Sequence, residues 1–266
     1  MDLSTFFNST FPIIGCVHLQ PLPGSPGFSG DLKTVRDQAL SEAQMLEDQG
    51  VHGLIIENFG DTPFYKKKVP AHTIANMTSI ARDIRKQVQL PIGINVLRND
   101  AEAALCIAQA VEAQFIRINI HMHAMVTDQG LVEGKSYRTL RLRKLLQTDI
   151  KIFADINVKH ASSIVKPDLL QWSEDLIYRG RADALIVSGS GTGKSIDEEE
   201  LLLLSKKKLA PIILGSGVNT DNLLELSRFS DAAIVGSYFK EEGVATNNVS
   251  SDRIRKFILA HGSIDK

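Results

Sequence analysis

Acidic, basic and amide side chains lie at the ends of several short apolar runs in this sequence. Glu57 closes the run GLIIE at 53–57, and Asp155 lies near the end of IKIFADI at 150–156. A carboxylate at such a position can act as a general base, and a lysine or histidine beside it can act as the electrophilic partner. We therefore predict that the catalytic residues are Glu57, Asp155, Lys159 and His18.

Other polar residues recur at alternate positions, which is the spacing of side chains on one face of a strand. Positions 117, 119 and 121 form one such series, and positions 155, 157 and 159 form another. Burying so many polar side chains in a core is costly unless each is paired, so a polar ligand site is the simpler explanation. The predicted substrate-binding residues on the strands are Asn58, Asn95, Arg117, Asn119, His121 and Asn157.

The elements that must position these residues are visible as a repeating pattern. Apolar runs typical of buried parallel strands occupy residues 12–17, 53–57, 91–96, 115–120, 150–156, 184–188, 211–215 and 232–236. Segments with helical periodicity lie between them, at 31–50, 73–88, 100–113, 137–147, 197–208, 220–229 and 251–262, and a further interrupted helix is expected within 161–180. This α/β series predicts a single (β/α)8 TIM-barrel domain over residues 1–266. A doubly wound open sheet is the alternative.

The carboxyl ends of the strands in such a barrel meet at one mouth, where the following loops form the active site. The polar residues above are therefore expected to converge on one pocket. Two alternatives remain open for Lys159, since it can form a structural ion pair with Glu57 or act as a Schiff-base nucleophile.

The loops after the last two strands are rich in glycine and serine. They read GSGVNTDN at 215–222 and GSYFKEEG at 236–243. Barrel enzymes commonly bind phosphate at this place, because glycines let backbone N–H groups approach an anion. The predicted phosphate-binding residues are Gly215, Ser216, Gly217, Gly236 and Ser237. Two tight turns without a ligand are the structural alternative.

The segment SGSGTGKS at 188–195 resembles a nucleotide-binding P-loop. That motif requires a glycine where this chain has Ser188, so a P-loop NTPase is the less favoured alternative. As the loop after the sixth strand, it would instead place Gly189, Thr192 and Gly193 beside the ligand.

Composition excludes several other classes. The 30 basic and 31 acidic residues give a net charge of -1, which argues against general nucleic-acid binding. No apolar run has the length of a membrane span, and the N-terminus lacks the pattern of a signal or transit peptide, so we expect a soluble cytoplasmic protein. Two histidines at 121 and 123 do not make a metal site without a third ligand, and neither a metal nor a cofactor is predicted.

Motifs in order along nearly the whole chain resemble the BtpA family. They are GCVHLQPLPGSPGF (15–28), ENFGDTPF (57–64), INVLRNDA (94–101), FIRINIH (115–121), TDQGLVEG (127–134), ADINVKHA (154–161), SGSGTG (188–193) and LGSGV (214–218). The resemblance implies a barrel of the ribulose-phosphate-binding type. It also implies a link to photosystem I biogenesis, through stabilisation of reaction-centre proteins.

Two functions follow from these observations. The first is an enzyme that acts on a small phosphorylated metabolite, either a sugar phosphate or a nucleotide-derived molecule, by lyase, isomerase or glycosidase chemistry. The second is a non-catalytic assembly factor for photosystem I, which in a photosynthetic cell would associate peripherally with thylakoids. An enzyme could also affect photosystem I indirectly, through a metabolite. The sequence leaves the oligomeric state open, with a homo-oligomer as one alternative.

Overall fold

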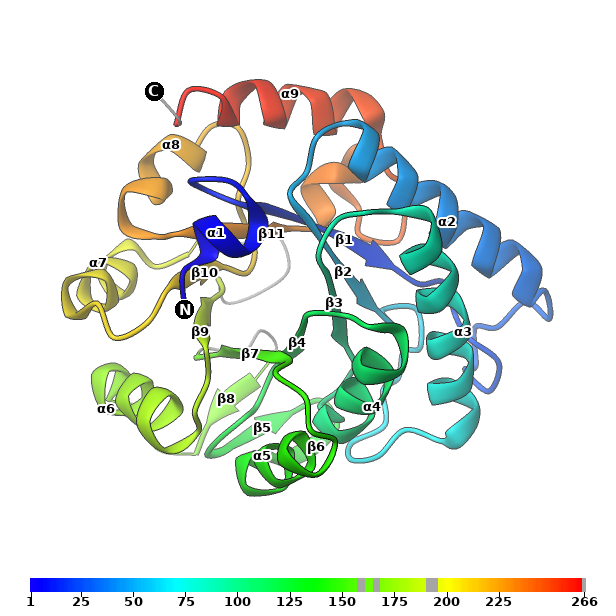
Figure 1. Ribbon diagram of the computed structural model, residues 1–266, viewed down its shortest axis with the longest axis horizontal. Coiled ribbons are helices and arrows are strands. Elements are labelled where there is room, and N and C mark those ends of the chain that lie inside the picture. Colours follow the sequence, from blue (N-terminus) through cyan, green and yellow to red (C-terminus); the bar gives the residue numbers. More distant parts are fainter. Residues whose placement is uncertain (157–160, 165–167, 190–195, 265–266) are drawn as a thin grey trace.

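Eight parallel strands close into a barrel in the computed structural model, which describes residues 1–156, 161–164, 168–189 and 196–264 (Figure 1). The strands are β1 (Ile13–His18), β2 (Gly53–Glu57), β3 (Ile92–Asn95), β4 (Phe115–Ile118), β7 (Lys151–Asp155), β9 (Ala184–Val187), β10 (Ile212–Leu214) and β11 (Ala232–Val235). Each pairs in parallel with its neighbours, and β11 returns to pair with β1. The predicted TIM barrel is confirmed, and the open sheet is excluded because the barrel closes.

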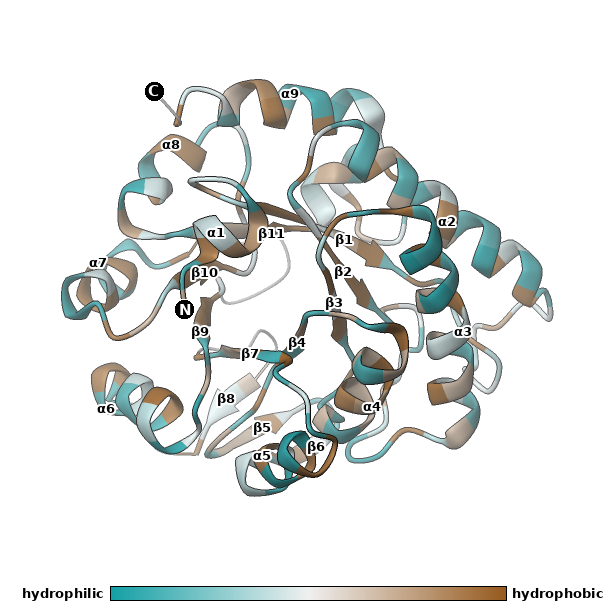
Figure 2. Ribbon diagram, viewed as in Figure 1, coloured by the Kyte–Doolittle hydropathy of each residue, from teal (hydrophilic) through white to brown (hydrophobic). Residues whose placement is uncertain are grey.

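Helices follow the strands and form the outer ring. They are α2 (Leu32–Asp48), α3 (Ala71–Gln87), α4 (Ala101–Val111), α5 (Ser136–Leu145), α6 (Leu169–Glu174), α7 (Glu198–Lys207), α8 (Leu223–Leu226) and α9 (Ser251–His261). Asp31, Asp100 and Asp197 cap three of them by accepting hydrogen bonds from backbone N–H groups of the first turn. Figure 2 shows apolar strands inside this ring and polar residues on the outer sides of the helices.

Three elements depart from a plain alternation of strands and helices. After β4, the strands β5 (Ala124–Thr127) and β6 (Gly130–Glu133) form a hairpin, and β8 (Ala161–Ser163) adds to its edge. The expected helix within 161–180 is therefore wrong at its start, since residues 161–163 form a strand that pairs with β5. The helix begins at Leu169, with Asp168 as its cap.

The amino-terminal end of the barrel is filled by aromatic side chains. Helix α1 (Leu3–Phe7) lies in front of the strands in Figure 1 and inserts Phe7 against Phe115, with ring centroids 5.8 Å apart. Phe115 in turn stacks on Phe153 at 4.6 Å. Gly93 makes room for this layer, because a Cβ there would lie 2.0 Å from the Phe115 ring. This packing fills the amino-terminal end of the barrel with side chains.

A membrane-spanning helix would need a long apolar stretch. None of the helices within the described residues is both long and apolar enough to cross a bilayer.

Candidate functional site at the barrel mouth

A cavity of about 430 Å³ opens at the carboxyl ends of the barrel strands. Its walls include side chains from the ends of β1, β2, β3, β4 and β7, and backbone from the loops after β10 and β11. Pockets of roughly 300–1,000 Å³ are typical of small-molecule sites. The cavity therefore has the size and the position of a TIM-barrel active site.

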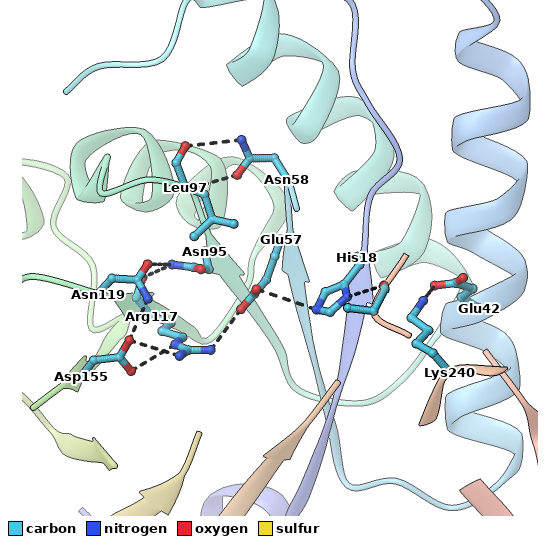
Figure 3. A network of polar contacts seen from close by, with 11 residues as sticks. His18, Glu42, Glu57, Asn58, Asn95, Leu97, Arg117, Asn119, Asp155 and Lys240 are labelled. Atoms are coloured by element: carbon cyan, nitrogen blue, oxygen red, sulfur yellow. Dashed lines mark hydrogen bonds and ion pairs between the residues drawn. The ribbon is translucent and has the colours of Figure 1, made fainter. Parts of the chain in front are cut away.

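Arg117 lies between the two predicted catalytic carboxylates (Figure 3). Its Nε and Nη2 donate to Asp155 Oδ1 and Oδ2 at 3.2 and 3.1 Å, and its Nη1 donates to Glu57 Oε1 at 3.3 Å. Burial acts to lower the pKa of Arg117, but the charges of Asp155 and Glu57 outweigh it and hold that pKa above its usual value. Arg117 is thus a permanently charged bridge between the two carboxylates.

Two asparagines extend the same network. Asn119 donates from Nδ2 to Asp155 Oδ2 at 2.7 Å. Asn95 donates to Asn119 Oδ1 at 3.2 Å and to the Arg117 carbonyl at 3.0 Å. All these side chains line the cavity, as predicted from their strand positions. Asp155 therefore receives donors from both Arg117 and Asn119.

His18 faces Glu57 across the mouth. Its Nε2 lies 4.0 Å from Glu57 Oε2, and its ring stacks on Phe59 with centroids 4.4 Å apart. Its Nδ1 lies 3.1 Å from the carbonyl oxygen of Ala245. A carbonyl can only accept, so Nδ1 carries the proton of the neutral ring and Nε2 carries the lone pair.

The glycine-rich loops form the opposite wall. Gly215, Ser216, Gly217, Gly236 and Ser237 all line the cavity. Space is tight at two of them, since a Cβ at Gly215 would lie 2.4 Å from Ser188 Oγ and one at Gly236 would lie 3.2 Å from the His18 ring. Gly217 adopts φ 73°, a conformation that other residues rarely take. On this wall of the cavity, the backbone therefore lies close to the space that a ligand would occupy.

Three of the predicted binding residues that the structure describes do not line the cavity, namely Asn58, His121 and Gly189. Asn58 instead holds the β3–α4 loop, because its side chain accepts from Leu97 N–H at 2.7 Å and donates to the Leu97 carbonyl. His121 is buried, and its Nε2 contacts the Gly180 carbonyl at 2.8 Å. Strand β4 ends at Ile118, and Asn99 binds both backbone groups of Ile120, so the strand alternation does not continue to position 121.

The loop after β9 contacts the predicted phosphate wall through Gly189. Gly189 is buried, and its N–H donates to Ser216 Oγ at 3.1 Å, which joins the β9 loop to the predicted phosphate wall. Four predicted site residues lie outside the described part of the chain, namely Asn157, Lys159, Thr192 and Gly193, and so do the lysine and serine that end the P-loop-like segment.

Several residues at the mouth escaped the sequence analysis. The most notable are Arg98 from the β3–α4 loop, Asp128 from the β5–β6 turn and Arg253 from α9. Burial lowers the pKa of Arg98, while the charges of Asp155 and Asp128 act in the opposite direction. Arg98 lies within the quoted motif INVLRNDA, in the loop that follows β3, and that position could have identified it. Arg253 lies in the first turn of the expected helix at 251–262 and carried no comparable signal.

Within residues 1–156, 161–164, 168–189 and 196–264, no three His, Cys, Asp or Glu side chains gather in a way that could hold a metal ion.

The fold and the cavity define a TIM-barrel protein with a polar site at its mouth. Residues 9–262 match the BtpA family, and the chain belongs to that family. It is 45% identical to an uncharacterized protein of Methanocaldococcus jannaschii over 93% of this chain and 94% of that one. It is 42% identical to the photosystem I biogenesis protein BtpA of Synechocystis, over 98% of this chain and 91% of that one.

Solved structures share the fold at low sequence identity. Phosphoribosyl anthranilate isomerase from Thermus thermophilus superimposes with a TM-score of 0.60 at 14% identity, covering 96% of this chain and all of that one. At this identity the likeness establishes the barrel fold alone.

Proposed function

We propose that this protein is an enzyme that acts on a small phosphorylated metabolite at the barrel mouth. The observation that carries the proposal is the two-sided cavity. One side holds a buried network of Glu57, Arg117 and Asp155, and the other consists of the glycine and serine loops after β10 and β11. Polar groups that converge on a pocket of this size favour a small polar ligand. The phosphoribosyl anthranilate isomerase that shares the fold supports the same proposal, but only by analogy of fold.

The two carboxylates have different surroundings, which suggests different roles. Asp155 accepts from Arg117 through both oxygens and from Asn119 as well, so it fixes the position of Arg117. Glu57 accepts from Arg117 through Oε1, and its Oε2 faces His18 Nε2. Glu57 is therefore the better candidate for the general base, with His18 as its partner.

The geometry of that pair suits proton transfer. The 4.0 Å between His18 Nε2 and Glu57 Oε2 exceeds a hydrogen bond, and both atoms can accept a proton. A substrate hydroxyl or an acidic C–H that faces this pair would give its proton to one of the two groups, and the same group would return that proton to another atom of the substrate. Such a step is common to isomerases, lyases and glycosidases, so we place the reaction in that range.

Thermal unfolding in a panel of sugar phosphates and nucleotides tests the proposal. A ligand present at 100 times its dissociation constant stabilises the folded state by about 2.7 kcal/mol, which raises the melting temperature by several degrees. Gly217→Asp should abolish this shift, because a carboxylate would occupy the predicted phosphate position. Gly30→Asp is the matched control, since Gly30 also has a positive φ (90°) but has no atom within 4 Å of its Cβ position. The absence of any shift with phosphorylated compounds would contradict the proposal.

A second candidate function is a non-catalytic role in photosystem I assembly. It is favoured by the name of the Synechocystis relative, a photosystem I biogenesis protein, and by one surface feature of this chain. Val126 and Leu131 pair across β5 and β6 on the outer face of the hairpin sheet, and Ile164 directly follows β8. These three side chains are 49%, 41% and 60% exposed. Exposed apolar side chains on a sheet can form a docking surface.

Complementation separates the two functions. A Synechocystis strain that lacks its own BtpA would receive this chain or its Glu57→Gln variant, and the photosystem I content would be measured. Rescue by both proteins would favour the non-catalytic role. Rescue by the unmodified chain alone, with equal amounts of both proteins in the cell, would favour the enzyme.

A further inference from the structure

We infer that Arg253 of α9 is the anion-recognition residue of the mouth cavity, and that it orients a phosphomonoester whose other end donates hydrogen bonds. This inference rests on the proposed function. It adds one side chain to the backbone loops that are predicted to bind phosphate, and it specifies the chemical class of the substrate.

Arg253 is held at the cavity wall by the β11 loop. Its Nε donates to the Tyr238 carbonyl at 2.6 Å, and its guanidinium carbon lies 4.6 Å from the centre of the Tyr238 ring. Tyr238 directly follows Ser237, and both line the cavity together with Arg253. The guanidinium is therefore fixed next to the predicted phosphate wall before any ligand binds.

Among the described residues, the terminal nitrogens of Arg253 are not paired with a carboxylate. In the described part of the chain, no ion pair involves Arg253, and its hydrogen bond uses Nε alone. Gly243, another cavity residue, approaches it closely, since a Cβ there would lie 3.6 Å from Nη2. Guanidinium groups bind phosphate oxygens through paired N–H donors, so Arg253 is arranged to receive one.

The other two arginines of the cavity have a different environment. Arg117 forms ion pairs with Glu57 and Asp155. Arg98 interacts electrostatically with the negative charges of Asp155 and Asp128. Among the described residues that line that side, two arginines and three carboxylates leave one net negative charge. A phosphate would be repelled there and attracted to Arg253, so the charges orient the substrate along the cavity.

This polarity also limits the substrate. The carboxylates and the amide oxygens of Asn95 and Asn119 accept hydrogen bonds, so the far end of the ligand should carry hydroxyl or amino groups. A second phosphate at that end would meet the net negative charge. A sugar monophosphate therefore fits this cavity better than a bisphosphate does.

Calorimetric titration with inorganic phosphate and with ribose 5-phosphate tests the role of Arg253. Arg253→Met should weaken the binding of both probes by about tenfold to a hundredfold, the usual range for one charge-assisted hydrogen-bonding group. Arg253→Lys should bind with an intermediate affinity, because the charge remains but the paired donors do not. Arg255→Met is the matched control, since Arg255 lies on the same helix and pairs with Asp252 on the surface. Its affinity should equal that of the unmodified protein.

The possible outcomes distinguish a failure of the role of Arg253 from a failure of the proposed function. If Arg253→Met binds both probes like Arg255→Met, the role of Arg253 is refuted and the proposed function is untouched. If the unmodified protein binds neither probe nor any other phosphorylated compound, the proposed function fails and this inference fails with it. If ribulose 1,5-bisphosphate binds as tightly as ribose 5-phosphate, the inferred substrate class is refuted. Melting curves without ligand confirm that each variant is folded.

Discussion

Arg117 and Asp155 form a buried two-point ion pair, with N–O distances of 3.2 and 3.1 Å, at the centre of the mouth network. Removal of the arginine alone would leave Asp155 and Glu57 as buried charges without their partner. Arg117→Met should therefore lower the free energy of unfolding by about 3–5 kcal/mol at pH 7, as measured by urea denaturation. A loss of less than about 1 kcal/mol would contradict the role of Arg117 as the partner of these two carboxylates.

A second buried ion pair joins the β11–α9 loop to α2. Lys240 Nζ lies 2.6 Å from Glu42 Oε2, and Lys240 is 1% exposed (Figure 3). Lys240→Met should cost about 3–5 kcal/mol of folding free energy, because Glu42 remains buried without its partner. The double variant Lys240→Met/Glu42→Leu should recover most of that loss, because apolar groups of similar size can replace a buried pair. Additive effects in urea denaturation would contradict this coupling.

The proton position on His18 is a direct test of the site geometry. Its Nδ1 contacts the Ala245 carbonyl, whereas His121 contacts the Gly180 carbonyl through Nε2. When both imidazole rings are neutral, nitrogen-15 NMR should therefore show His18 protonated on Nδ1 and His121 protonated on Nε2. The same tautomer for both rings would contradict the assignment of His18 Nε2 as a proton acceptor in the cavity.

Burial of His121 makes folding sensitive to mild acid. Burial lowers the pKa of His121 below the ordinary value of 6.5, against the opposing effect of its hydrogen bond to Gly180. The unfolded chain therefore binds the proton more readily, so this contribution to stability is complete above about pH 6.5 and is lost as the pH falls below it. The urea midpoint of the unmodified protein should drop more between pH 7.5 and pH 5.5 than that of His121→Gln. His72→Gln is the control, because His72 is exposed.

The burial of His123 adds a smaller effect of the same sign. Its pKa is lowered by burial, with Asp175 acting in the opposite direction. His121→Gln should therefore reduce the acid sensitivity without abolishing it. An unchanged drop in the midpoint would show that His121 is not the residue responsible.

The barrel was predictable because its strands carry strong local signals. Each predicted strand agrees with an observed one to within a few residues, since buried parallel strands read as continuous apolar runs. The hairpin of β5 and β6 was not predicted, because short two-stranded pairs have weak patterns and their stability depends on what they pack against. Here Met125 and Val132 pack with Ile120 in a small core of their own.

The predicted residues that line the cavity lie on the barrel strands, directly after β4 in the case of Asn119, or in the glycine-rich loops after β10 and β11. Asn95, Arg117, Asn119 and Asp155 converge as expected, because strand alternation and closure of the barrel dictate their direction. Asn58 and His121 lie beyond the last strand residues, where the loop path rather than alternation sets the orientation of a side chain. Their contacts with Leu97 and Gly180 depend on segments distant in the sequence.

The sequence by itself determined the barrel, the family and the glycine-rich wall at the mouth, because these depend on local pattern and on the order of the elements. Only the tertiary structure decided which charges compensate one another. Arg117 is bridged by carboxylates from two other strands, whereas Arg253 reaches the same cavity from the last helix. That difference arises from closure of the barrel, which brings β11 and α9 next to β1, and no local signal in the sequence encodes it.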